Sequence, residues 1–110
     1  MLSNPYFYGI LVMFGTKNVE ITTTRKGTRV MHELGVLCHA IRTVDRIAEE
    51  RGVRKIRFIT LEVGSESSFV PAYFTKLYPV AIENFPRFEN STLNIEKISG
   101  SSLNIKEIGY

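Results

Sequence analysis

Residues 31–50 read MHELGVLCHAIRTVDRIAEE and contain the longest regular pattern in the chain. The apolar residues of this stretch recur at alternating steps of three and four, as on one side of an amphipathic helix: Leu34, Leu37, Ile41, Val44 and Ala48. Gly52 follows, and glycine most easily takes the left-handed conformation found just past a helix end. The pattern predicts a helix that starts at Met31, stops before Gly52 and packs one face against the rest of the protein.

The next segments predict a strand and a second helix. Residues 53–63 alternate apolar and polar side chains, as a strand does, and residues 64–70 form a serine-rich loop. Pro71 suits the first turn of a helix, where its missing N–H is not needed. Pro79 lies inside this second helix, so we expect a kink or a break there. The helix has an apolar stripe of its own: Phe74, Leu77, Tyr78, Ala81, Ile82 and Phe85.

Two near-identical segments end the chain, LNIEKI at 93–98 and LNIKEI at 103–108. Both alternate, and the Gly/Ser-rich residues 99–102 join them, which predicts a hairpin. From residue 31 the elements therefore run helix, strand, helix, strand, strand. We predict an α+β fold in which both helices pack on one face of a small three-stranded sheet.

Residues 1–30 differ from the rest in pattern and in charge. An aromatic and aliphatic run at 6–14, a turn signal at 15–18 and a β-branched run at 19–24 predict an additional hairpin, with a basic linker at 25–29. Four basic residues and one acidic residue lie in this segment, which accounts for the whole net charge of +3. Because the rest of the chain is neutral, the basic balance does not belong to the folded domain, and we expect no nucleic-acid partner.

Length and composition exclude several classes of protein. A chain of 110 residues with 44% hydrophobic residues has the size of one folded domain. Its one cysteine can form neither an internal disulfide nor a cysteine-rich zinc site. The longest apolar run, at 6–14, is about half as long as a membrane span and lacks the preceding charge of a signal peptide. We expect a cytoplasmic protein with no membrane partner.

Three short motifs follow one another from Met31 onward: Met-His-Glu-Leu at 31–34, Leu-Glu-Val-Gly at 61–64 and Ile-Lys-Glu-Ile at 105–108. Over about residues 31–110 the sequence resembles the HypA/HybF family of hydrogenase nickel-insertion chaperones. These three motifs, in this order along the chain, carry the resemblance.

The resemblance implies a metallochaperone, not an enzyme, that delivers Ni(II) during maturation of [NiFe]-hydrogenase. It places the nickel site at Met31, His32 and Glu33. Family members begin at that methionine, so a terminal amine, the next amide and an imidazole can surround Ni(II) in one plane, a geometry this ion accepts. The implied partners are the hydrogenase large subunit and a maturation GTPase. A urease role and the oligomeric state stay open.

The sequence departs from the family in three places. No cysteine follows Cys38, so the family's zinc module between the last two strands is missing and we expect no structural zinc. Ser65 replaces the acidic residue after the strand glycine, and Glu66 comes one place later. Thirty residues precede Met31, and while they are attached its nitrogen is an amide. Residues 1–30 are therefore either an extension of the nickel-binding domain 31–110 or a mis-assigned start.

Other metal ligands and other functions have less support. Cys38 and His39 are adjacent on a helix and point to different sides, and His39 lies about 10 Å from His32. We predict that Cys38 packs in the core and His39 lies on the surface. Two rival functions stay open: a degenerate interaction module that binds no metal, and a small nucleic-acid binder acting through residues 17–29.

Overall fold

The computed structural model describes residues 10–12 and 29–110, with side chains from Glu33 onward. The elements in chain order are β1 (Ile10–Val12), α1 (Arg29–Glu50), β2 (Phe58–Gly64), α2 (Pro71–Ala81), a 3-10 helix (Pro86–Phe88), β3 (Thr92–Ile98) and β4 (Leu103–Gly109). From α1 onward the helices and strands follow the predicted order. Neither helix in residues 29–110 combines the length and the apolar character that crossing a membrane requires.

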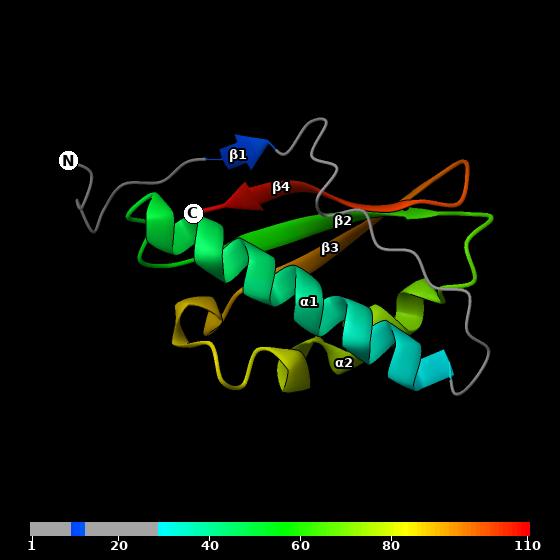
Figure 1. Cartoon of the computed structure of the whole chain (residues 1–110), viewed down its shortest axis with the longest axis horizontal. Coiled ribbons are helices and arrows are strands. Elements are labelled where there is room, and N and C mark those ends of the chain that lie inside the picture. The colour runs from blue at the N-terminus through cyan, green and yellow to red at the C-terminus, as the bar shows by residue number, and fades with distance from the viewer. Residues whose placement is uncertain (1–9, 13–28) are drawn as a thin grey trace.

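The strands form one mixed sheet in the order β1-β4-β2-β3, and both helices lie on one of its faces (Figure 1). β2 runs parallel to β3 and antiparallel to β4. The helices bury one set of alternate side chains from β2 and β4: Ile59, Leu61, Val63, Leu103, Ile105 and Ile108. The predicted α+β architecture is confirmed, with β1 as an additional strand at the β4 edge.

α1 buries the predicted stripe and ends where Gly52 indicates. Gly52 has a φ of 73°. Its N–H donates to the Glu49 oxygen at 3.3 Å, and the Val53 N–H donates to the Ala48 oxygen at 2.8 Å. These two bonds form the Schellman motif that closes many helices. The helix begins at Arg29, two residues earlier than predicted.

Within residues 1–30 the structure describes β1 and the first two residues of α1. Ile10 lies opposite Gly109 and Val12 lies opposite Glu107 in an antiparallel pair. The remainder of the predicted N-terminal hairpin, and the linker up to residue 28, lie outside the described residues.

The strand predicted for residues 53–63 is too long at its start, because β2 begins only at Phe58. The chain must first cross from the end of α1 to the sheet. During this crossing the Val53 N–H bonds to the Ala48 oxygen and the Ile56 N–H bonds to the Arg87 oxygen, at 2.8 and 2.9 Å. Backbone acceptors outside the sheet therefore bind the N–H groups of this segment, although its side chains alternate like those of a strand.

The hairpin predicted for the last two strands is wrong, because β2 lies between β3 and β4. The connection at 99–102 arches over the end of β2. Three backbone N–H groups at the end of β2 donate to backbone oxygens of this connection and of the residue before it. Gly64 donates to the Ser102 oxygen at 2.8 Å, Ser65 to the Ile98 oxygen at 2.7 Å and Glu66 to the Gly100 oxygen at 2.7 Å. β3 and β4 both pair with β2, whose Ile59, Leu61 and Val63 face the core. Burial therefore decides the pairing and the turn signal does not.

α2 starts at Pro71, as predicted, and ends at Ala81, within one turn of Pro79. Pro79 has no N–H to donate to the carbonyl one turn earlier, which weakens this last turn. Ile82 and Phe85 of the predicted stripe therefore lie beyond the helix, although both pack against the same core.

Candidate metal centre

Met31 and His32 lie in the first turn of α1. The first four N–H groups of a helix have no acceptor inside the helix. Because α1 begins at Arg29, the Met31 N–H belongs to this set, whereas the His32 N–H lies at the position where the first intrahelical bond forms. A metal ion can take the Met31 nitrogen without breaking a helical hydrogen bond. The side chains of the two residues lie outside the described part of the structure.

Glu33, the third predicted ligand, is fully buried, with 0% of its surface exposed. Its Oε2 accepts a hydrogen bond from the backbone N–H of Val70 at 2.7 Å. Its Oε1 is also buried and has no hydrogen-bond partner among the described residues. The two oxygens of one carboxylate therefore differ: one accepts a bond from the loop before α2, and the other has no partner in the part of the chain that the structure describes.

The unpaired oxygen suits Glu33 to hold a cation. A buried carboxylate is unfavourable unless other groups balance its charge. The Val70 N–H and the positive end of α2 supply part of that balance. The salt bridges between described residues involve other carboxylates: Asp45, Glu49 and Glu96. Nickel binds nitrogen and oxygen ligands, so a carboxylate oxygen is a suitable donor. Because Oε2 already accepts the Val70 N–H, Glu33 can offer such an ion only Oε1.

The loop between β2 and α2 lies at the same end of the molecule as the start of α1 (Figure 1). Ser67 fixes the shape of this loop, because its Oγ donates to the Gly64 oxygen at 2.7 Å and accepts the Phe69 N–H at 3.3 Å. Ser65 and Glu66, the positions where the sequence departs from the family pattern, are exposed. The arch at 99–102 covers the same end of β2 through its bonds to residues 64–66.

The other candidate ligands on α1 are placed largely as predicted. Cys38 is half-buried, packs against the core and is a free thiol. His39 is exposed. Within the described ranges no three His, Cys, Asp or Glu side chains come close enough together to hold a metal ion. A metal centre at this end of α1 therefore depends on Met31 and His32, with Glu33 beside them.

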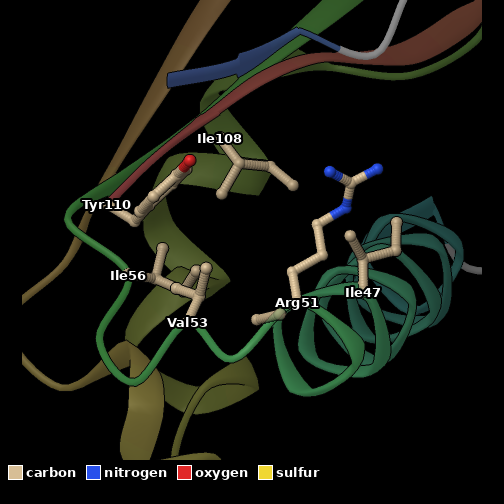
Figure 2. Close-up of a pocket in the computed structure, with 7 residues that line it drawn as sticks. Ile47, Arg51, Val53, Ile56, Ile108 and Tyr110 are labelled. Carbon is tan, nitrogen blue, oxygen red and sulfur yellow. The ribbon is translucent and has the colours of Figure 1, made fainter. Parts of the chain in front are cut away.

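A small apolar pocket lies near the other end of α1 (Figure 2). Val53 and Ile56 from the crossing segment face Ile108 and Tyr110 at the end of β4, and the Arg51 side chain extends beside Ile47. None of the side chains that line this pocket has a carboxylate, an imidazole or a thiol. It is not a metal site and lies away from the candidate centre.

The bond between Glu33 and Val70 was not predicted, but a signal for the burial of Glu33 is present in the sequence. Glu33 lies four residues before Leu37, and Leu37 lies four residues before Ile41, so the three share one helix face. Leu37 and Ile41 are fully buried. A glutamate that continues a core stripe by helical spacing should itself be buried. Its partner, 37 residues later, gives no local signal.

One protein-family model matches residues 31–103 of the chain, and its description is HypA, hydrogenase/urease nickel incorporation, metallochaperone. The matched part begins at Met31 and includes both helices, β2 and β3. No curated protein and no solved structure matches the chain.

Proposed function

Because this chain belongs to the HypA family of metallochaperones for hydrogenase and urease nickel incorporation, we propose that it is a cytoplasmic carrier of Ni(II) and not an enzyme. The observation that carries the proposal is the family match, which starts at the residues that would bind the metal. We propose the [NiFe]-hydrogenase large subunit as the recipient and a maturation GTPase as a partner, with urease as the alternative target.

The proposed ligands are Met31, His32 and Glu33. A terminal amine on Met31, the amide nitrogen of His32 and the His32 imidazole provide three nitrogen donors in one plane around Ni(II). Glu33 adds at most Oε1, since Oε2 already accepts the Val70 N–H. The buried, unpaired Oε1 supports the assignment of Glu33 to a cation site.

The amine donor requires a chain whose first residue is Met31. We therefore propose that the nickel-binding domain comprises residues 31–110 and that residues 1–30 are absent from the nickel-binding form. The family match that begins at Met31 and the neutral charge of residues 31–110 support this division. No cysteine follows Cys38, so delivery would proceed without the zinc module of the family.

A second candidate function is an interaction module that keeps the fold and binds no metal. The pairing of β1 with β4 favours it, because an N-terminal segment that adds a strand to the sheet is an integral part of the domain. In that form Met31 has no free amine, and the nickel site cannot form as described above.

The two candidates are separated by the intact mass of the protein expressed from its native upstream DNA, followed by nickel titration of the same material. A mass that begins at Met31, with one nickel bound per chain, supports the carrier. His32→Ala should then abolish binding, whereas His39→Ala, which changes an exposed histidine on the same helix, should leave it unchanged. A mass that begins at Met1 without bound nickel supports the interaction module.

A further inference from the structure

α2 begins without a capping side chain of its own. Its N-cap residue is Val70, which has an extended backbone and no side chain that can accept a hydrogen bond. The first turn contains no acidic residue, and its first position is Pro71. Most helices place Ser, Thr, Asp or Asn at the N-cap because the first N–H groups need acceptors. At α2 the acceptor must come from elsewhere in the chain.

Glu33 supplies this acceptor from a different helix. Its Oε2 lies 2.7 Å from the Val70 nitrogen, and the whole side chain is buried between α1 and the start of α2. A negative charge at this position also interacts favourably with the positive end of the α2 dipole. The contact therefore joins the second turn of α1 to the N-cap of α2, through two residues that are 37 positions apart in sequence.

Capping alone does not explain why a carboxylic acid stands at this buried position. A neutral amide would accept the Val70 N–H as well and would bury no negative charge, although its NH2 group would then take the position of Oε1 without an acceptor. The unpaired Oε1 indicates that Glu33 also serves a second, cationic group. The residues next to it in sequence are Met31 and His32, the proposed nickel ligands.

We propose that Glu33 is a positioning residue that links the nickel site to α2, with Oε2 holding the Val70 N–H while Oε1 is left for the cation. This inference rests on the proposed function. A cation at Oε1 balances the buried charge and holds the Glu33 side chain in place. The loop at 65–70 and the first turn of α2 therefore become more ordered when nickel is bound. The order of this loop thus differs between the metal-free and the nickel-bound protein.

The test is amide hydrogen exchange over residues 64–74, measured by mass spectrometry with and without Ni(II), on the protein as its native DNA produces it. Nickel stoichiometry is measured on the same samples. Without metal, Glu33→Ala should speed exchange of this segment about fivefold, the effect of losing a helix cap. Glu33→Gln keeps an acceptor oxygen and should exchange at close to the wild-type rate.

With Ni(II), exchange of residues 64–74 should slow in the wild-type protein but not in Glu33→Gln. Glu66→Gln is the matched control, because Glu66 is exposed on the same loop and its variant should behave as the wild type does. If Glu33→Ala does not fold, Glu33→Asp replaces it, since a side chain shorter by one methylene should also lose the bond to Val70.

Three results would overturn the proposal, and they differ in what they say about the proposed function. Unchanged exchange in metal-free Glu33→Ala or Glu33→Asp refutes the cap. Nickel bound at one per chain with unchanged wild-type exchange refutes the link to α2 while the nickel carrier survives. An absence of nickel binding refutes the carrier and the link together, even where the cap is confirmed.

Discussion

At the scale of single residues, Arg87 is the side chain that holds the segment before β3 against α1. Its Nε donates to Asp45 Oδ1 at 2.9 Å, one terminal nitrogen donates to Glu49 Oε1 at 2.7 Å, and the other donates to the Val53 oxygen. Burial alone would lower the Arg87 pKa, but the hydrogen bonds to Asp45 and Glu49 outweigh it, and the pKa is raised. The guanidinium is therefore charged at every pH at which the protein folds.

Arg87→Ala should lower the free energy of unfolding by about 2 kcal/mol, because it removes hydrogen bonds between charged groups and leaves the Val53 oxygen without its donor. Arg87→Lys should recover less than half of this loss, since an ammonium cannot reproduce the forked geometry. Urea denaturation measures both. The control Arg54→Ala removes an exposed arginine and should change stability little. Equal losses in Arg87→Ala and Arg54→Ala would contradict this assignment.

Tyr78 makes stability depend on pH in the alkaline range. Burial raises its pKa, and the hydrogen bond of its hydroxyl to Ser91 at 2.7 Å only partly offsets this. In the unfolded chain tyrosine ionises near pH 10. Below that pH both states are neutral and the contribution of Tyr78 is intact. As the pH rises from there towards the higher folded-state pKa, only the unfolded chain ionises, and stability falls.

Unfolding free energies measured from about pH 8 to pH 11 should therefore fall less steeply in Tyr78→Phe than in the wild type. At neutral pH this variant should lose about 1 kcal/mol, from the missing bond to Ser91. Ser91→Ala should lose a similar amount at neutral pH but keep the alkaline decline. A decline of equal slope in the wild type and Tyr78→Phe would show that other groups cause it.

At the scale of elements, local sequence patterns predicted the positions and ends of the helices. Helical spacing located α1, Gly52 located its end, and Pro71 located the start of α2, because each of these signals acts within one or two turns. Strand pairing is not local. The Gly/Ser sequence of 99–102 suits a hairpin turn and an arch over β2 equally well, and only the completed sheet distinguishes them.

Some features of the candidate site could likewise be predicted from the sequence, and others could not. Its position at Met31, His32 and Glu33 came from a resemblance, and the burial of Glu33 could have been read from its spacing to Leu37 and Ile41. The bond to Val70 could not, since it requires the relative placement of α1 and α2. Sequence patterns of this kind identify which face a side chain lies on but not the backbone group that it meets.

The arch over β2 depends on the absence of a side chain at Gly64. A Cβ atom there would lie 2.4 Å from the Gly100 oxygen and 2.9 Å from the Ser102 nitrogen, both of which are backbone atoms. Gly35, on the exposed side of α1, has no such neighbour within 4 Å. The same substitution should therefore have opposite effects at the two glycines.

Gly64→Ala should destabilise the protein by about 2 kcal/mol, because the arch must move away from β2. Gly35→Ala should stabilise it by about 0.5–1 kcal/mol, the usual gain from replacing glycine inside a helix. Thermal unfolding of the two variants beside the wild type checks both signs at once. A neutral Gly64→Ala would mean that the arch is not packed tightly against β2.

At the scale of the whole molecule, α1 crosses the sheet and has two different ends (Figure 1). The Schellman motif, the Arg87 bonds and the apolar contacts around Val53 and Ile56 secure its C-terminal end. Near its N-terminal end, Glu33 has a buried carboxylate oxygen without a hydrogen-bond partner in the described part of the chain. A firmly packed core thus presents one polar, incompletely bonded end, where the cargo metal is proposed to bind.

X-ray absorption at the nickel edge shows whether nickel is held by nitrogen and oxygen donors at this end of α1, as proposed. The nickel-loaded protein should show a planar first shell of nitrogen and oxygen atoms, with imidazole scattering that disappears in His32→Ala and persists in His39→Ala. A sulfur atom in the shell, which Cys38 could supply, or a spectrum unchanged by His32→Ala would place the metal elsewhere and contradict the account.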